Sequence, residues 1–450
     1  MYTFLKKYHT HFLYSILTLV SIYLCFESIT KGIFLISIFT MWYVLSIKKS
    51  KTLTTLPLLF FIIPFNITLQ IFLPSTNPYV SGFWVNYLIP TLSIVDVFVV
   101  LLLIQLIFLV SKHTLIKQIK DKYLLVLLAL FFIQALIVQD FVSTLMYIRI
   151  FVYLFSSILL MRYMKESGYI KKVLQNRYTN YLLLSTILIQ GVVGMYQFLR
   201  GTSLGVYFLG ESEISSGIVG SSFIDIQGEL FLRSYGTFPH PNVLAGWYLF
   251  VILLTLFFYS KSKKRAFILT AVISSILLIF TFSRVSLLLL LLISLIYILK
   301  ERKIFSFTSL LYYRFLNIFN DGDNSLRDRV ELMKVNIEIL QENILLGTGL
   351  GNSLRFYSDN IPFTQGGKLL LQPVHNIWIL NFVELGILLG VYYLYLLFRY
   401  FIKGIKLNWI SISILLFIFL IGMFDHYLFT LPQGNIILFS SLILLSDSRE

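Results

Sequence analysis

The chain has 450 residues, of which 58% are hydrophobic and only 13% are charged. A water-soluble protein of this length cannot bury so much apolar surface, whereas a lipid bilayer accommodates it. The apolar residues form continuous runs, such as 124–138 and 285–299, and not the alternating pattern of a transmembrane β-barrel. The composition therefore predicts an all-α protein, a polytopic integral membrane helix bundle.

The net charge of +15 does not indicate nucleic-acid binding, because the basic residues fall in short clusters between the hydrophobic runs. Such clusters are typical of the cytoplasmic loops of membrane proteins. They lie at 48–51, 112–122, 162–177, 261–265, 300–303 and 399–406. We therefore expect the lipid bilayer, and no nucleic acid, as a partner of the chain.

Hydrophobic runs along the chain predict about 12 to 14 transmembrane helices. The expected spans are 12–27, 32–47, 55–73, 92–110, 123–138, 143–161, 181–198, 243–259, 266–282, 285–299, 375–398, 409–424 and 433–446, with a weaker span at 304–319. A cleaved signal peptide is the alternative interpretation of the first run, but no small-residue cleavage site follows it, which favours a retained span. The weaker span contains Arg314, which we place near its outer end.

One topology places every basic cluster on the cytoplasmic side, with the N-terminus cytoplasmic. The outer segments are then 74–91, 199–242, 320–374 and 425–432. We divide the chain into N-terminal transmembrane helices, 1–180, and a core with two large outer loops, 181–450.

The outer segment 320–374 contains a predicted amphipathic helix. Ser325 begins a capping box with Asp328, and Val330, Met333, Ile337 and Leu340 follow at helical spacing. We expect this apolar face to rest on the membrane surface or on the helix bundle.

Three histidines stand at the expected outer ends of spans, each beside a polar residue. His240 precedes Pro241 and Asn242, His375 precedes Asn376, and His426 follows Asp425. A single interfacial histidine is usually structural, but three at one membrane face indicate a shared site.

Arginines gather at the same face, at positions 233, 284, 314, 327 and 329. Arg284 lies between two apolar runs that are joined by almost no loop. The alternative to a role in ligand binding is that it anchors the helix end at the membrane interface. Arg327 and Arg329 lie in the first turn of the amphipathic helix, where the helix dipole disfavours cations unless an anion is bound. A solvated charged loop is the competing interpretation. The arginines and histidines together favour a phosphorylated amphiphile as ligand.

Several motifs resemble those of the bacterial O-antigen ligase and O-antigen polymerase superfamily. They are Ser203-Leu204-Gly205, Leu209-Gly210-Glu211, the stretch Arg233 to Ala245, Arg284 with Leu288, Arg329 to Met333, the loop Gly347 to Asn352, His375-Asn376 with Glu384 and Gly386, and Asp425-His426-Tyr427. The resemblance extends from about Tyr181 to the C-terminus.

The resemblance implies a membrane glycosyltransferase that moves a glycan from an undecaprenyl-pyrophosphate carrier to an acceptor hydroxyl at the outer face of the plasma membrane. The acceptor is a glycan, a lipid or a protein, and no metal or other cofactor takes part. The implied catalytic residues are His375 as general base and Arg284. The implied substrate-binding residues are Arg233, His240, Asn242, Arg327, Arg329, Asn376, Glu384 and His426.

Three alternatives remain from the sequence. A lipid-linked oligosaccharide flippase or other transporter is disfavoured, because such proteins place polar groups near mid-membrane and contain internal repeats. A metal site made of the three histidines and Asp425 is disfavoured, because no pair has close ligand spacing. A membrane scaffold would leave the arginines without a role.

Overall fold

The computed structural model describes residues 10–11, 13–21, 29–48, 53–74, 76–168, 177–218, 220–226, 228–301, 324–357 and 369–447. Across these residues the chain is an all-α polytopic membrane protein, as predicted. The helices are α2 (Ile29–Lys48), α3 (Thr55–Ile62), α4 (Ile94–Leu109), α5 (Lys112–Ile119), α6 (Lys122–Val138), α7 (Phe141–Ser167), α9 (Arg177–Arg200), α10 (Pro241–Ser262), α11 (Arg265–Ile279), α12 (Arg284–Glu301), α14 (Asn324–Glu342), α15 (Ile377–Leu397), α16 (Trp409–Phe424), α17 (Tyr427–Thr430) and α18 (Pro432–Asp447).

Five of these helices are long and apolar enough to cross a membrane: α2, α7, α9, α10 and α15, the last extended to Ile402. α5 and α6, bent by 46° at their junction, form a sixth span if they are taken as one. Four further apolar helices, α4, α11, α16 and α18, are shorter. These counts concern the described residues alone, and the expected span at 304–319 with Arg314 lies outside them.

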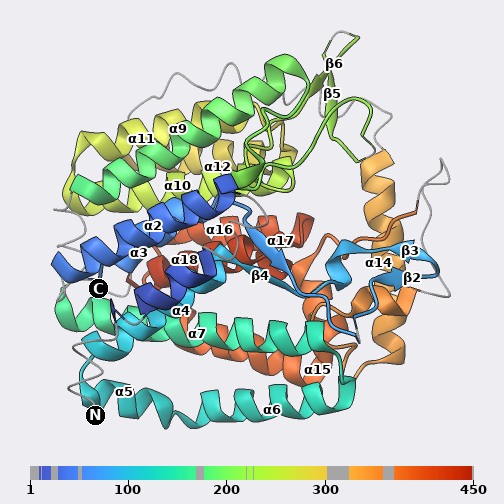
Figure 1. The fold of residues 1–450 in the computed structure, drawn as a ribbon, viewed down its shortest axis with the longest axis horizontal. Helices are drawn as coiled ribbons and strands as arrows, with labels where there is room; N and C mark the ends of the chain where they lie inside the picture. The colour runs from blue at the N-terminus through green and yellow to red at the C-terminus, as the bar shows by residue number, and fades with distance from the viewer. Residues whose placement is uncertain are drawn as a thin grey trace.

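The helices run side by side, and their two ends differ in character (Figure 1). One end, the loop end, carries three short antiparallel sheets among the described residues. β1 (Thr68–Gln70) pairs with β4 (Thr91–Ser93), and two hairpins are formed by β2 (Tyr79–Val80) with β3 (Phe83–Trp84) and by β5 (Phe223–Ile226) with β6 (Glu229–Leu232). The opposite end, the basic end, carries the connections at 110–122, 262–265 and 403–408. The basic clusters among the described residues thus lie away from the hairpins.

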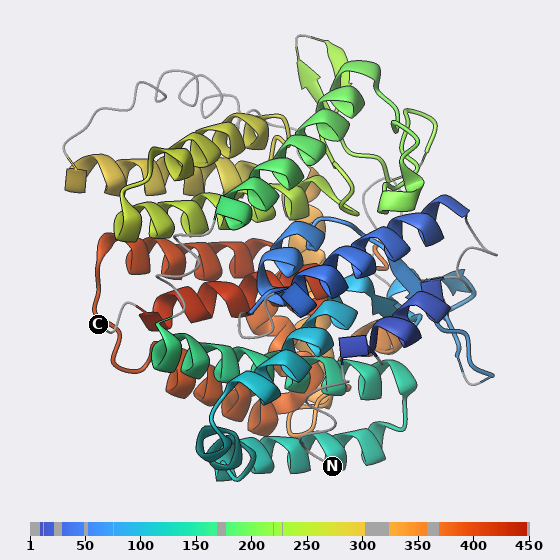
Figure 2. The ribbon, with the colours of Figure 1, turned by 60° about the vertical axis from the view of Figure 1, so that its left-hand side comes forward.

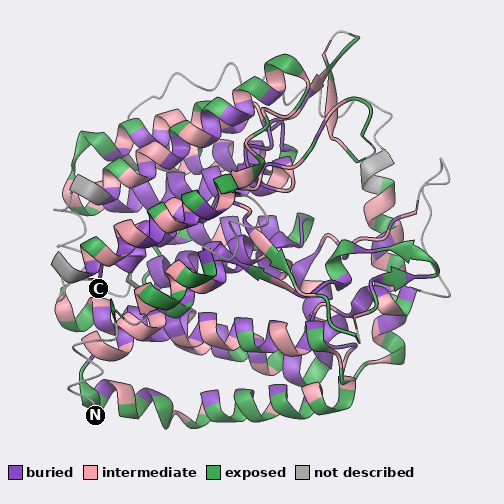
Figure 3. Cartoon of the chain, viewed as in Figure 1, coloured by how far each residue is buried: buried purple, intermediate pink, exposed green. Residues whose placement is uncertain are grey.

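Helix α10 forms the centre of the core. Its residues from Val243 to Phe258 are buried without exception, and it packs against α11, α12, α16 and α18. Figure 2 shows α9 to α12 stacked beside α16 and α18, and Figure 3 shows α10 and α18 buried while α6 lies at the periphery. Helices from both sides of residue 180 share this core, since α3 packs on α9 and α7 on α18.

A close contact fixes the short helix α17 against α10. Tyr427, 1% exposed, lies so near Gly246 that a Cβ there would meet its hydroxyl oxygen at 1.7 Å. On the other side, a Cβ on Gly434 would meet the Tyr427 carbonyl oxygen at 1.8 Å. Only glycine fits at these two positions, so α10 and α18 hold α17 from both sides.

The expected span 55–73 is wrong. Helix α3 ends at Ile62, and β1 begins six residues later at Thr68 and pairs with β4. Pro64 lacks the N–H that the next helical turn needs, which stops the helix early. The apolar residues beyond it are used in the β1–β4 sheet and the core.

The predicted apolar face of α14 is only partly confirmed. Met333 and Leu340 pack against the core, but Val330 and Ile337 are exposed, and Leu332, Asn336 and Ile339 are fully or almost fully buried instead. Asn336 was not expected to be inside, but its Nδ2 donates to the Leu332 carbonyl and to the Tyr357 hydroxyl, at 2.8 and 2.5 Å. α14 runs across the loop end of the bundle, packed on α15 (Figure 1). The side chain of Ser325, and with it the expected capping box, lies outside the described residues.

Helix α15 is interrupted at Gly386, whose φ of 69° and ψ of 174° are not helical. The loop after α14 uses the backbone groups that the break sets free. Ile387 N donates to Ile344 O at 2.8 Å, Thr348 N to Val383 O at 2.9 Å and Gly349 N to Glu384 O at 2.9 Å. The glycine-rich loop is therefore bonded into α15, which satisfies polar backbone atoms inside the bundle.

Candidate active site

A buried polar cluster occupies the loop end, where α10 and α15 begin and α16 ends. It consists of His240, His375, Asp425 and His426, and we call these four residues the histidine cluster. Asp425 and His426 are 9% and 6% exposed. Three segments far apart in the sequence thus bring their titratable side chains to one place, and burial removes Asp425 and His426 from bulk water.

The geometry within the cluster is tight. The rings of His375 and His426 lie with centroids 5.1 Å apart and planes at 78°. One ligand atom from each of His375, Asp425 and His426 lies within 4.8 Å of the other two. The two Asp425 oxygens are both used: Oδ1 accepts from the His426 backbone N–H at 2.8 Å, and Oδ2 accepts from Asn242 Nδ2 at 3.1 Å.

Arg233 is joined to this cluster through Asn242. Its Nη2 donates to Asn242 Oδ1 at 2.8 Å, and its Nε donates to the Thr281 carbonyl, also at 2.8 Å. Asn242, in the first turn of α10, therefore links the guanidinium to the Asp425 carboxylate. The Thr281 bond ties the same guanidinium to the turn that leads into α12 and Arg284.

The histidines differ in their hydrogen bonds. His240 caps α10: its Nδ1 accepts from Asn242 N at 3.2 Å, and its Nε2 lies 3.4 Å from Ser222 Oγ. His426 Nδ1 lies 2.8 Å from Thr430 Oγ1. His375 Nδ1 is buried without a hydrogen-bond partner among the described residues. Of the three rings, His375 thus retains an unpaired buried nitrogen, which is costly unless another molecule pairs with it.

Burial keeps the histidines neutral. It lowers the pKa of His240 to about 3, helped by the charge of Arg233, and lowers the pKa of His426 to about 3. Burial and the charge of Arg329 lower the pKa of His375, although Asp425 opposes them. Burial disfavours a charge on Asp425, but the surrounding histidines and the Asn242 amide hold its pKa below the ordinary value. A neutral imidazole beside a carboxylate can accept a proton.

Three arginines face the same region. Burial, together with the charges of Arg284 and Arg329, lowers the pKa of Arg233 to about 10, which places all three cations near one another. Arg233 still carries its charge at pH 7. Arg284 is exposed as the first residue of α12, and Arg329 is half-buried on α14. Such a concentration of cations is unfavourable without an anion between them.

Asn376 and Glu384, which were also named from the sequence, make their described hydrogen bonds outside the cluster. Asn376 caps α15, since its Oδ1 accepts from Trp378 N and Ile379 N at 2.9 and 3.1 Å. Glu384 is 1% exposed, and its Oε1 accepts from Ser353 Oγ at 3.0 Å in the segment after the glycine-rich loop. Arg327 is exposed on α14. The hydrogen bonds of Asn376 and Glu384 indicate a structural role for both residues: Asn376 caps α15, and Glu384 fixes the segment that contains Ser353.

The structure adds Tyr87, which the sequence did not indicate. Its ring lies 5.7 Å from the ring of His426, at 78°. Tyr87 comes from the N-terminal half, in the 3₁₀ turn η1 (Asn86–Leu88). No motif marks it, and only its place in an expected outer segment pointed toward this face.

The metal alternative has a geometric basis in His375, Asp425 and His426. Both Asp425 oxygens accept N–H donors, and His426 Nδ1 lies beside Thr430 Oγ1. Ligating carboxylates and histidines commonly carry such second hydrogen bonds, so these contacts are compatible with a metal ion as well as with proton transfer.

Residues 242–394 match the family model described as O-antigen ligase. The matched segment contains Asn242, Arg284, Arg329 and His375, while Arg233, His240, Asp425 and His426 lie just outside it. Comparisons with curated proteins and with solved structures gave no match. The apolar helices show a polytopic membrane protein, and the matched segment is similar to O-antigen ligases, which supports a function in glycan transfer at a membrane.

Proposed function

We propose that the chain transfers a glycan from an undecaprenyl-pyrophosphate carrier to an acceptor hydroxyl at the outer face of the plasma membrane, without a metal ion. The observation that carries the proposal is the network Arg233–Asn242–Asp425–His426 beside His375. The network combines neutral bases with fixed cations at one end of a membrane helix bundle. Glycan transfer from a lipid pyrophosphate needs a base for the acceptor hydroxyl and cations for the leaving pyrophosphate.

The arginines act on the leaving group. When the bond between the anomeric carbon and the pyrophosphate oxygen breaks, the electron pair stays on the pyrophosphate, whose charge increases. Arg233 is already oriented by two hydrogen bonds, to Thr281 and Asn242. A preoriented guanidinium stabilises developing charge without reorganising in the reaction. Arg284 and Arg329, from α12 and α14, extend the cationic region over which the two phosphates lie.

His375 acts on the acceptor. The acceptor oxygen attacks the anomeric carbon, and its proton passes to the unpaired Nδ1 of His375 or, through one water, to the cluster. Asp425 then stabilises the imidazolium that forms, since its charge raises the pKa of His375. His240 and His426 are worse placed for this role, because their Nδ1 atoms are occupied by Asn242 N and Thr430 Oγ1.

The test is transfer by the purified chain in liposomes that contain an undecaprenyl-pyrophosphate-linked glycan. We expect a new glycosidic bond and released undecaprenyl pyrophosphate, and activity that survives a chelator. A lengthened lipid-linked glycan would identify a polymerase, and a glycan moved to a lipid or protein acceptor would identify a ligase. Movement of the intact donor across the bilayer with no new bond would overturn the proposal in favour of a flippase.

A further inference from the structure

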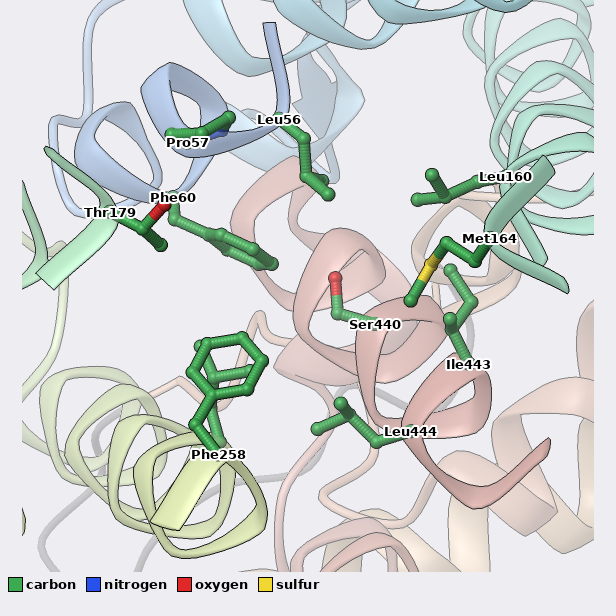
Figure 4. Close-up of a pocket in the computed structure, with 11 residues that line it drawn as sticks. Leu56, Pro57, Phe60, Leu160, Met164, Thr179, Phe258, Ser440, Ile443 and Leu444 are labelled. Carbon is green, nitrogen blue, oxygen red and sulfur yellow. The ribbon is translucent and has the colours of Figure 1, made fainter. Parts of the chain in front are cut away.

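A cavity lies far from the histidine cluster, near the basic end. It lies between five helices, is partly open and has a volume of about 40 Å³ (Figure 4). Its lining residues are Leu56, Pro57, Phe60, Leu160, Met164, Thr179, Leu254, Phe258, Ser440, Ile443 and Leu444, and we call it the apolar pocket. The pocket and the histidine cluster are separated by most of α10, whose 22 residues span about 33 Å.

The position of the pocket along each helix is consistent. α7, α10 and α18 contribute residues of their last turns, and α3 and α9 contribute residues of their first turns. All of these are the ends that lie away from the hairpins (Figure 1). The pocket is therefore buried at the depth of one leaflet, the leaflet next to the basic end.

Its wall is hydrocarbon apart from two hydroxyl groups. Thr179 is 2% exposed, and its Oγ1 has no hydrogen-bond partner among the described residues. The Ser440 hydroxyl points into the space between Phe60 and Leu160 (Figure 4). A buried hydroxyl without a partner is costly, and a molecule with an acceptor oxygen near its apolar part would satisfy it. An ester-linked acyl chain has both parts.

Two lysines lie close to the pocket residues, on the side of the basic end. Lys261 follows the pocket residue Phe258 by three positions on α10, and Lys165 follows Met164 directly on α7. Both are exposed, and Lys261 contacts the ring of Phe257 at 5.7 Å. Basic residues beside a gap between transmembrane helices attract anionic lipid head groups.

We propose that the apolar pocket holds one acyl chain of an anionic phospholipid from the leaflet at the basic end. The head group lies against Lys165 and Lys261, the ester oxygen accepts from Thr179, and the chain lies among Leu254, Phe258 and Leu444. The lipid joins α7, α9, α10 and α18 at the end opposite the reaction. This site is independent of the proposed glycan transfer.

Native mass spectrometry of the purified chain tests the proposal, with phosphatidylglycerol and phosphatidylcholine of identical acyl chains as probes. We expect phosphatidylglycerol to bind at least about fivefold better, because the two lysines attract an anionic head group. Lys165→Gln with Lys261→Gln should remove this preference, while Lys300→Gln, on an exposed lysine of α12, should not. Equal binding of the two lipids to the unaltered chain would overturn the charge assignment.

A second pair of variants tests the pocket itself. Ser440→Leu fills the space and should reduce phosphatidylglycerol binding severalfold, whereas Ser440→Ala keeps the space open and should retain it. Ser37→Leu, on the exposed face of α2, is the control for a new apolar side chain. Thermal melting of each variant must show a folded protein. Unchanged binding by a folded Ser440→Leu variant, or displacement of the lipid by undecaprenyl phosphate at equal concentration, would sink the assignment.

Discussion

The three histidines of the cluster differ mainly in their hydrogen-bond partners. His240 and His426 are each engaged through Nδ1, whereas His375 Nδ1 is not. The sequence placed all three at one membrane face from their positions at the ends of hydrophobic runs. It did not reveal which ring nitrogen is free, because that depends on Thr430 and Asn242 from other turns.

We expect His375→Gln to lower transfer at least about 100-fold, since glutamine forms hydrogen bonds but accepts no proton at neutral pH. Donor binding should remain near normal, because the arginines are unchanged. His240→Gln is the matched comparison and should lose less activity. The measurement is single-turnover transfer together with donor affinity. Normal turnover by His375→Gln with inactive His240→Gln would move the base to His240.

The pH dependence follows from the lowered pKa of His375. A free histidine titrates near 6.5, so a base with that value would lose activity as the pH falls through 6.5. Burial lowers the pKa of His375, which keeps the ring neutral below pH 6.5. We expect kcat/KM for transfer to stay level from pH 8 to 6.5 and to fall only at more acidic pH. An acidic limb centred at or above 6.5 would contradict this environment.

Arg233 and Arg327 form a matched pair of arginines. Arg233→Lys loses the two directed bonds to Thr281 and Asn242, so we expect transfer to fall at least tenfold, by about 1.5 to 3 kcal/mol. Arg327→Lys changes an exposed side chain and should stay within about twofold. Steady-state transfer at several donor concentrations separates binding from catalysis. Equal effects at both positions would remove Arg233 from the leaving-group site.

At the scale of elements, the sequence predicted most helices and missed the interruptions. Continuous apolar runs predicted α4, α6, α7, α9 to α12, α15, α16 and α18. Pro64 was present as a stop signal within 55–73, but apolar residues beyond it resembled a continuing span. The buried face of α14 was partly misassigned because Asn336 is polar and only its bond to Tyr357 explains its burial.

The break in α15 predicts a specific instability. Gly386→Ala adds a Cβ at 2.3 Å from Leu345 O, at a φ of 69°. We expect loss of at least about 2 kcal/mol in unfolding free energy, from strain and from expulsion of the 344–349 loop. Gly404→Ala has a similar φ of 79° but no atom within 4 Å of the added Cβ, so it should cost only about 1 kcal/mol. Thermal unfolding in detergent compares the two, and equal losses would mean that the loop contact contributes nothing.

The whole molecule has two chemically different ends, and this was predictable from the spacing of basic clusters. What the sequence could not predict is which N-terminal segments meet the core. Tyr87 reaches His426, and Arg149 on α7 forms a buried ion pair with Asp96 on α4, with Nε and Oδ1 2.8 Å apart. Hydrophobic runs carry no information on which helices become neighbours.

The sidedness of the bundle predicts an accessibility pattern. With Cys25 replaced by serine, Leu230→Cys in the β5–β6 hairpin should react with a membrane-impermeant maleimide in intact cells. Lys263→Cys, at the basic end, should react only after the membrane is opened. Both side chains are exposed, so access alone decides the result. The reverse pattern would place the histidine cluster at the cytoplasmic face.

The contact of Tyr427 with Gly246 also bears on how relatives of this chain can diverge. Because the tyrosine fills the space that a side chain at 246 would need, the two positions are not free to change separately. A lineage that gains alanine at 246 should also carry a smaller residue at 427, and the loss of tyrosine should come first. Gly246 lies within the matched family segment, and Tyr427 lies beyond its end. A conservation profile of either position alone would therefore miss that the two residues change together.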